Sequence, residues 1–131
     1  MVGLVVVSHS AKAAEGICDV AAEMGSAEAE IVAAGGDEDG SIGTSAPRIQ
    51  DAIEQARDDD GVVVLVDLGS AVMNTELAIE MLEAEDDDVR IADAPILEGT
   101  LNAAVNAAGS KATLESVVEA AEDAREYRKL N

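Results

Sequence analysis

The sequence predicts an α/β domain of three layers, with helices on both faces of a mostly parallel central sheet. Two short runs, at 4–7 and 62–66, consist of branched aliphatic residues, and such runs are typical of strands buried on both faces. Segments with helical spacing alternate with these runs and with two weaker strand patterns. That order predicts right-handed crossovers within one sheet. Residues 1–131 are long enough to form a single domain with a full core.

The composition excludes several classes of function. The chain has 28 acidic and 8 basic residues, three of them lysines, and a formal net charge of −20. Such a surface repels nucleic acid and anionic lipid, and neither Phe nor Trp is present to stack on bases or sugars. We interpret the acidic, lysine-poor composition as that of a halophile. No apolar run approaches about 18 residues, and no cleavable leader is visible, so we expect a cytoplasmic protein without membrane insertion.

The segment after the first strand predicts a helix over 11–24, with Ser10 as its cap and Gly25 at its end. The apolar residues expected to face the core are Ala14, Ile17, Ala21 and Met24, with Cys18 and Val20 widening that face. A weakly alternating second strand follows at 28–34. Cys18 is the single cysteine, which excludes an internal disulfide, and it is expected to be a small buried hydrophobic residue.

Residues 35–45 give the strongest loop signal in the chain, with four glycines in nine residues. Without a Gly-Lys-Ser/Thr sequence, this is not a nucleotide P-loop. It is either an acidic surface loop or a loop that brings backbone N–H groups to an anion. The next helix is expected to begin at Pro47 or just before it, with Thr44 or Ser45 as cap, and to end at the solvated acids 58–60. Its inner stripe is Ile49, Ala52, Ile53 and Ala56.

A polar cluster at 67–70 follows the second aliphatic run, and Ser70 is expected to cap a helix over 71–84. The apolar face of this helix is predicted from Val72, Leu77, Ile79, Met81 and Leu82, with Met73 packed beside them.

A short strand is predicted at 89–92. Pro95 is incompatible with a central, fully paired strand, so the segment around it is expected to be an edge segment or an arm that reaches a neighbouring subunit. Two further helices are predicted at 100–109 and 112–128, with a break at Gly109–Ser110.

Polar residues follow three of the predicted strands and are expected to meet at one edge of the sheet. They lie in three segments, Ser8-His9-Ser10, the loop at 36–45 and the cluster at 67–70, of which His9 and Asp67 carry the chemistry. A carboxylate beside a neutral imidazole fixes its tautomer and stabilises the imidazolium that forms when the other nitrogen attacks. Attack on phosphorus gives a phosphohistidine, whose oxygens are bound by helix amino termini and glycine-rich loops. The candidate phosphate-binding residues are Ser10, Gly36, Thr44, Gly69 and Ser70.

Simpler interpretations remain open for both central residues: His9 as a structural histidine, and Asp67 as a cap-like residue after a strand. A Ser-His-Asp hydrolase is disfavoured because neither Ser8 nor Ser10 lies in a Gly-x-Ser-x-Gly elbow. A two-component receiver domain has the same layout but needs an acidic pair after the first strand. With one histidine and one cysteine in the chain, we expect no metal and no cofactor.

Four motifs occur in order along the chain. They are VVVSHS at 5–10, AAGGDEDGSIGTSA at 33–46, VLVDLGSA at 64–71 and APILEGTLNAAV at 94–105. Together they resemble the phosphoryl-donor subunit of the phosphoenolpyruvate-dependent dihydroxyacetone kinase. That subunit has the mannose-type enzyme IIA fold of the sugar phosphotransferase system.

This resemblance implies a phosphocarrier of glycerol metabolism, with His9 phosphorylated on Nε2 and Asp67 holding Nδ1–H. The phosphoryl group would arrive from the carrier protein HPr, charged by enzyme I, with both donors on separate chains. It would leave to ADP on the nucleotide-binding subunit of the kinase, for the phosphorylation of dihydroxyacetone. Family members are homodimers that exchange an edge strand, which suits an arm at Pro95. Two alternatives remain: a phosphorylation-dependent regulatory module, and enzyme IIA of a mannose-family sugar transporter.

Overall fold

Residues 1–25, 29–82 and 88–130 are described by the computed structural model of the protein. Their elements, in chain order, are β1 (Gly3–Ser8), α1 (Ala11–Met24), β2 (Ile31–Gly35), α2 (Ala46–Ala56), β3 (Val62–Val66), α3 (Gly69–Glu80), β4 (Val89–Ala92), α4 (Ile96–Ala107), α5 (Leu114–Asp123) and a 3-10 turn, η2 (Ala124–Glu126). The alternation of strands and helices that the sequence predicts is therefore confirmed.

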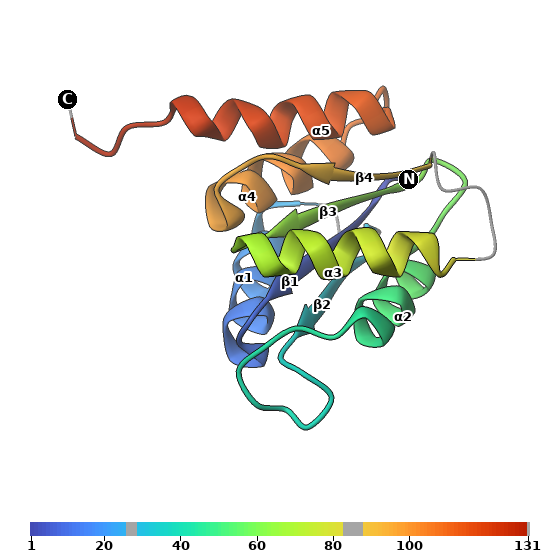
Figure 1. Ribbon diagram of the computed structural model, residues 1–131. Helices are drawn as coiled ribbons and strands as arrows, with labels where there is room; N and C mark the ends of the chain where they lie inside the picture. Colours follow the sequence, from blue (N-terminus) through green and yellow to red (C-terminus); the bar gives the residue numbers. More distant parts are fainter. Residues whose placement is uncertain (26–28, 83–87, 131) are drawn as a thin grey trace.

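The strands form one parallel sheet in the order β2-β1-β3-β4 (Figure 1). Val5 of β1 stands opposite Val32 of β2 and Val64 of β3. β1 and β3 are thus the central strands, and their aliphatic residues are buried, Val66 in part, because successive side chains point into opposite covered layers. The second strand begins later than predicted, at Ile31, and residue 28 lies outside the described residues.

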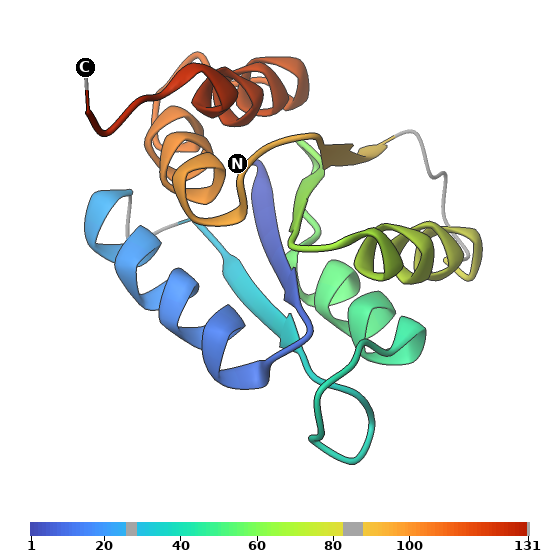
Figure 2. The same ribbon diagram turned by 60° about the vertical axis from the view of Figure 1, so that its left-hand side comes forward.

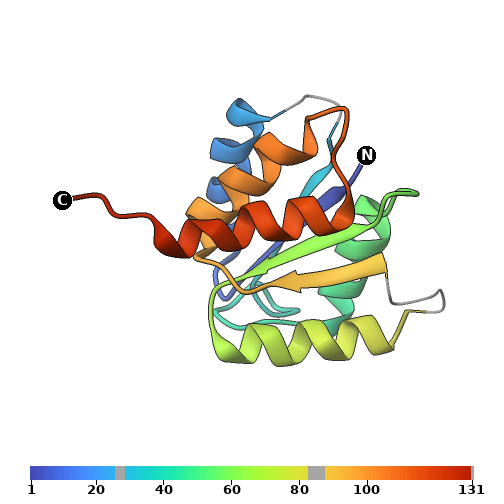
Figure 3. The same cartoon turned by 90° about the horizontal axis from the view of Figure 1, so that it is seen from above.

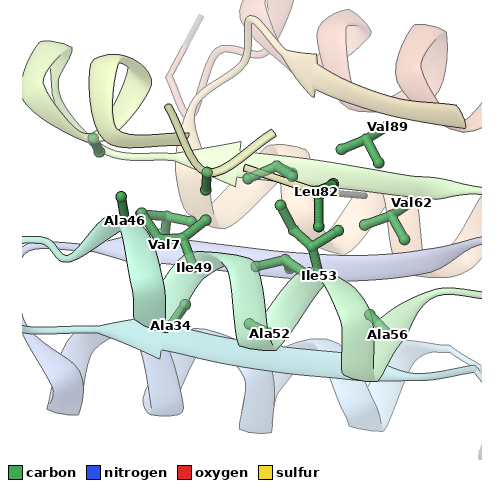
Figure 4. Close-up of a cluster of buried hydrophobic side chains, with 14 residues drawn as sticks. Val7, Ala34, Ala46, Ile49, Ala52, Ile53, Ala56, Val62, Leu82 and Val89 are labelled. Atoms are coloured by element: carbon green, nitrogen blue, oxygen red, sulfur yellow. The ribbon is translucent and has the colours of Figure 1, made fainter. Parts of the chain in front are cut away.

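Helices cover both faces of the sheet, α2 and α3 on one side and α1, α4 and α5 on the other (Figure 2). Each side has its own core. In the core under α2, Ile49 and Ile53 lie over Val7 and Val62 (Figure 4). The core on the opposite face is built around Leu4 with alanines and valines of α4 and α5. The predicted three-layer architecture is confirmed.

The boundaries of α2 follow the sequence signals. The Ser45 side chain accepts a hydrogen bond from the Arg48 amide, with Pro47 in the first turn. The predicted stripe of α2 is buried. The acidic residues after this helix form ion pairs that the sequence did not suggest. The Met1 ammonium lies 3.0 Å from Asp58 and 2.7 Å from Asp60.

Two helices bury less of their large side chains than the sequence predicts. On α1, Met24 and Val20 are exposed, and on α3, Met73 is exposed. Leu77 and Met81 are also exposed, so the predicted face of α3 was wrong in part. The residues that pack fully are small: Ala14 and Ala21 on α1, and Ala71, Thr75 and Ala78 on α3. Small side chains let a helix approach the sheet closely, and larger neighbours on the same turn are then left at the rim.

Helix α3 begins earlier than predicted, at Gly69, with Leu68 at the N-cap position and no side-chain cap bond. Ser70 therefore lies inside the first turn and does not cap the helix. The helix ends at Glu80, and residues 83 and 84 of the prediction lie outside the described residues.

The segment around Pro95 is not an extended arm. Pro95 is the N-cap of α4, which starts at Ile96, four residues before its predicted start. The strand before this segment, β4, is one of the two edge strands and pairs with β3 within the described part of the sheet. The last predicted helix is divided into α5 and η2, and the chain after it leads away from the sheet (Figure 3).

Candidate functional site

The site forms where β1 and β3 end side by side. Because Val7 pairs with Val66, the next residues of the two strands, Ser8-His9 and Asp67, meet at the carboxyl edge of the sheet. The Nδ1 atom of His9 lies 2.9 Å from Oδ1 of Asp67. The pairing of His9 with Asp67 that the sequence predicts is present.

Asp67 accepts four hydrogen bonds, two on each carboxylate oxygen. Oδ2 accepts from the Ser8 hydroxyl at 3.0 Å and the His9 amide at 2.9 Å, and Oδ1 accepts from the His9 ring and from the Leu68 amide at 2.8 Å. Burial alone would raise the pKa of Asp67, but the hydrogen bonds from His9 and Ser8 outweigh it and the pKa is lowered. Asp67 is therefore a carboxylate at neutral pH.

An ionised carboxylate can only accept hydrogen bonds, so Nδ1 of His9 carries the proton. Nε2 then carries the in-plane lone pair. It lies 2.6 Å from Oγ of Ser70, in the first turn of α3. The His9 side chain is 22% exposed, and its contacts with Asp67 and Ser70 hold the ring in one orientation, as a nucleophile requires.

The loop between β2 and α2 supports the backbone of this site. The Gly43 amide donates to the His9 carbonyl at 2.9 Å, and the Gly36 amide donates to the Ser8 carbonyl at 3.1 Å. Gly36 has φ of +78°, a left-handed conformation that glycine adopts without strain. Asp37 accepts bonds from two amides of the loop, those of Asp39 and Ser41. These amides are engaged within the protein, which favours the interpretation of a structural loop over an anion-binding one.

The candidate phosphate-binding residues fall into two groups. Gly69 and Ser70 occupy the first turn of α3, where backbone N–H groups have no acceptor within the helix, and Ser70 touches His9. The others are engaged elsewhere: Ser10 caps α1 by accepting from the Ala13 amide, Thr44 accepts from Asn74, and the Gly36 amide is bound to Ser8. Phosphate binding by any of them stays a prediction.

Three supporting residues were given no role from the sequence, although Ser8 and Leu68 lie in segments expected to meet at this edge. They are Ser8, whose hydroxyl donates to Asp67, Leu68, whose amide does the same, and Asn74, which ties α3 to the loop through Thr44. The position of Ser8 directly before the histidine was a usable signal for the first. The other two contacts depend on how α3 docks.

The surroundings of His9 are apolar and acidic. The side chains of Ile42, Leu68 and Met73 are 75%, 61% and 71% exposed. Ile42 precedes Gly43, which binds His9, and Leu68 follows Asp67, so Ile42 and Leu68 flank the site. A cavity of about 450 Å³ opens between α3 and β4, and its lining includes carboxylates but neither Lys nor Arg. Such a cavity is unsuited to an anionic substrate.

Other chemistry finds little support among the residues that the structure describes. They contain no group of three or more His, Cys, Asp or Glu side chains that could hold a metal ion. Cys18 is half-buried, and burial, with Asp19 and Glu15 nearby, raises the pKa of its thiol to about 11. It is therefore a protonated thiol at neutral pH and a poor nucleophile. Within the same residues, no helix is long and apolar enough to span a bilayer.

Comparisons with known proteins point to one group. A family model described as "PTS system fructose IIA component" matches residues 3–118. The chain is 42% identical over 122 residues to the phosphoryl donor subunit DhaM of the PEP-dependent dihydroxyacetone kinase of Escherichia coli K12, covering 90% of this chain and 26% of that protein. It is 39% identical to the phosphotransferase subunit DhaM of the PTS-dependent dihydroxyacetone kinase of Lactococcus lactis, covering 89% and 90% of the two chains.

The chain thus spans about a quarter of the length of the first curated relative and most of the second. Among solved structures, a protein of unknown function is 34% identical and superposes with a TM-score of 0.82 over 99% of this chain and 98% of that one. The phosphotransferase component EIIA of Streptococcus agalactiae superposes with a TM-score of 0.65 at 16% identity, covering 98% and 97%. The latter likeness shows the fold alone.

Proposed function

This chain belongs to the EIIA-man family and, within it, to the phosphoryl donor subunits of dihydroxyacetone kinases, and from that membership we propose that it is a phosphohistidine carrier. It takes a phosphoryl group from HPr onto Nε2 of His9. It then passes the group to ADP held by the nucleotide-binding subunit of a dihydroxyacetone kinase. The exchange takes place in the cytoplasm and serves glycerol metabolism.

The hydrogen bond between Nδ1 of His9 and Asp67 is the observation that carries this proposal. When Nε2 attacks phosphorus, the N–P bond of the donor breaks and a new one forms on His9. The proton stays on Nδ1, so the ring becomes an imidazolium paired with the Asp67 carboxylate. In the second step an oxygen of ADP attacks phosphorus, and the electrons of the N–P bond return to Nε2. The carboxylate thus stabilises the charged state without exchanging a proton.

The first turn of α3 receives the phosphoryl oxygens. The amides of Gly69 and Ser70 stand at the positive end of the helix dipole, and the Ser70 hydroxyl lies 2.6 Å from Nε2. This arrangement supplies donors to a dianion at a site whose wider surroundings are acidic.

The surface around His9 suits a protein partner better than a free nucleotide. Ile42, which precedes the Gly43 that binds His9, and Leu68, which follows Asp67, offer exposed apolar area at the site, which a docking HPr or kinase subunit would cover. The neighbouring cavity has an acidic lining that disfavours ADP, so the nucleotide belongs on the acceptor subunit. The exposed edge of β4 is where we place the homodimer contact expected of this family.

Phosphorylation followed by intact-protein mass spectrometry tests the carrier role. The protein is incubated at high salt with phosphoenolpyruvate, enzyme I and HPr, and we expect the gain of one acid-labile phosphoryl group. His9→Ala should gain none, and it is compared with Ser41→Ala, a change at an exposed loop residue. A His9→Ala protein that still relays phosphate from HPr refutes the proposal.

The acceptor is tested separately, because an enzyme IIA of a sugar transporter would carry the same phosphohistidine. The description of the family model as a fructose IIA component is the observation that keeps this second candidate open. The purified phosphoprotein is mixed with the ADP-loaded kinase subunit or with the IIB component of a mannose-family transporter. Discharge to the first and not the second supports the kinase role, and the reverse result overturns it.

A further inference from the structure

The hydroxyl of Ser70 occupies the direction from which phosphorus must approach His9. Its Oγ lies 2.6 Å from Nε2, while Nδ1–H is directed to Asp67. Nε2 therefore carries the lone pair, and the serine hydroxyl is the donor in this contact. A hydrogen bond to an imidazole nitrogen and an N–P bond to it both use this same in-plane lone pair.

We propose that Ser70 is a positioning residue with two states. In the resting protein its hydroxyl donates a hydrogen bond to the lone pair of His9 Nε2. During transfer it swings aside, and in the phosphorylated protein it donates to a phosphoryl oxygen. This inference deepens the proposed function and rests on it for the second state only, because the first is a property of the unphosphorylated protein.

The two states exclude one another on steric grounds. Phosphorus bonded to Nε2 stands closer to the ring than the Ser70 oxygen does and in the same direction, so both cannot be present. The serine has room to turn, since it is exposed and lies at the second position of α3. No earlier helical turn restricts its rotamer there, unlike at positions farther along a helix. Exposed side chains change rotamer within picoseconds to nanoseconds, so this motion does not limit the transfer rate.

The contacts also assign the chemical role of Ser70. Together Asp67 and Ser70 hold the ring in one tautomer and one plane, with an acceptor at Nδ1–H and a donor at Nε2. As phosphorus takes the lone pair, the serine proton stays on its own oxygen. Ser70 is therefore neither an acid nor a base in the reaction. It exchanges one hydrogen-bond acceptor, Nε2, for another, a phosphoryl oxygen.

Nitrogen-15 NMR of the single histidine tests the resting state without any phosphoryl transfer. In Ser70→Ala we expect the Nε2 resonance to move downfield, toward that of a nitrogen with a free lone pair, and Nδ1 to stay protonated. Ser70→Thr, which restores a hydroxyl, should return Nε2 toward its original position. Ser41→Ala, the same change at an exposed loop serine, should leave Nε2 unmoved. An Nε2 resonance that is the same in wild type and Ser70→Ala overturns the proposal.

The second state is tested on protein phosphorylated chemically with phosphoramidate, which requires neither HPr nor the kinase. We expect the χ1 torsion of Ser70, measured from scalar couplings, to change to another staggered rotamer when Nε2 carries phosphorus. An unchanged χ1 contradicts the displacement. If HPr fails to phosphorylate the protein while both NMR results appear, the proposed donor is wrong and the role of Ser70 stands.

Discussion

Replacing Asp67 with Asn removes the charge beside His9 and keeps the size of the side chain. An Asn amide has one oxygen that accepts, whereas the Asp67 carboxylate accepts four hydrogen bonds on two oxygens. If the new amide nitrogen takes the place of Oδ2, the new amide oxygen takes the place of Oδ1 and still accepts from the His9 ring and from the Leu68 amide. The Ser8 hydroxyl can turn and accept from the new NH2 group. The His9 amide alone then loses its acceptor, which costs about 1–3 kcal/mol of stability.

The effect on transfer is larger than that structural loss suggests, because the ring becomes cationic when Nε2 is phosphorylated. Unit charges about 4 Å apart interact by about 4 kcal/mol at an effective dielectric constant of about 20. The Asp67 side chain is 20% exposed, and an amide oxygen keeps part of the attraction. We therefore expect the activation free energy of phosphorylation to rise by about 2–3 kcal/mol, which corresponds to a roughly 30- to 150-fold slower reaction.

Rapid-quench measurement of a single turnover from phosphorylated HPr provides this rate, with circular dichroism and urea unfolding as checks on the fold. Asp51→Asn is the matched control, since it makes the same change of charge at an exposed position of α2. A transfer rate for Asp67→Asn within about twofold of wild type would refute the role given to the carboxylate. Such a change in the activation free energy is well below the value of about 1.36 kcal/mol that corresponds to a tenfold change in rate.

Four further outcomes follow from the structure. The pKa of Asp67 is lowered, since the bonds from His9 and Ser8 outweigh the opposing effect of burial. The ionised Asp67 therefore contributes fully to the free energy of unfolding above its ordinary pKa of 3.8, and this contribution is lost as the pH falls through the lower pKa of the folded protein. Urea titrations should therefore show the stability difference between wild type and Asp67→Asn shrinking in acid. Ile53→Ala, at a fully buried position, should lower the free energy of unfolding by about 2–5 kcal/mol in the same assay. A Cβ at Gly35 would lie 2.6 Å from the Ser10 carbonyl and from the Ala11 Cα, so Gly35→Ala should displace the start of α1 and reduce both stability and transfer. Ile42→Glu, at an exposed apolar position, should raise the KM for HPr and leave the urea midpoint within about 0.5 kcal/mol of wild type.

The strands and the boundaries of α1 and α2 could be predicted because they depend on neighbours in sequence. The aliphatic runs of β1 and β3 form central strands, Ser10 and Ser45 cap the helices that follow them, and α1 has its predicted bounds. The meeting of His9 and Asp67 could also be predicted, since residues at the ends of adjacent parallel strands reach the same edge of the sheet.

Predictions from local sequence were wrong where one sequence pattern is compatible with two conformations. Pro95 has φ of −60° and ψ of 132°, an extended conformation that suits an arm as well as the residue before a helix. Only the packing of α4 against the sheet decided between them. Met73 fits a helical apolar stripe, yet it is exposed because small residues carry the contact of α3 with the sheet.

The partner of Ser70 depends on the tertiary structure and not on the residues around it. The sequence placed a serine at the start of a helix, where a capping role is the usual one. Its actual partner is His9, 61 residues earlier in the chain. A side-chain contact across that distance depends on how β1, β3 and α3 dock, and no local propensity encodes it. Local sequence signals thus placed His9 and Asp67 at one edge of the sheet, and the docking of α3 decided what stands in front of Nε2.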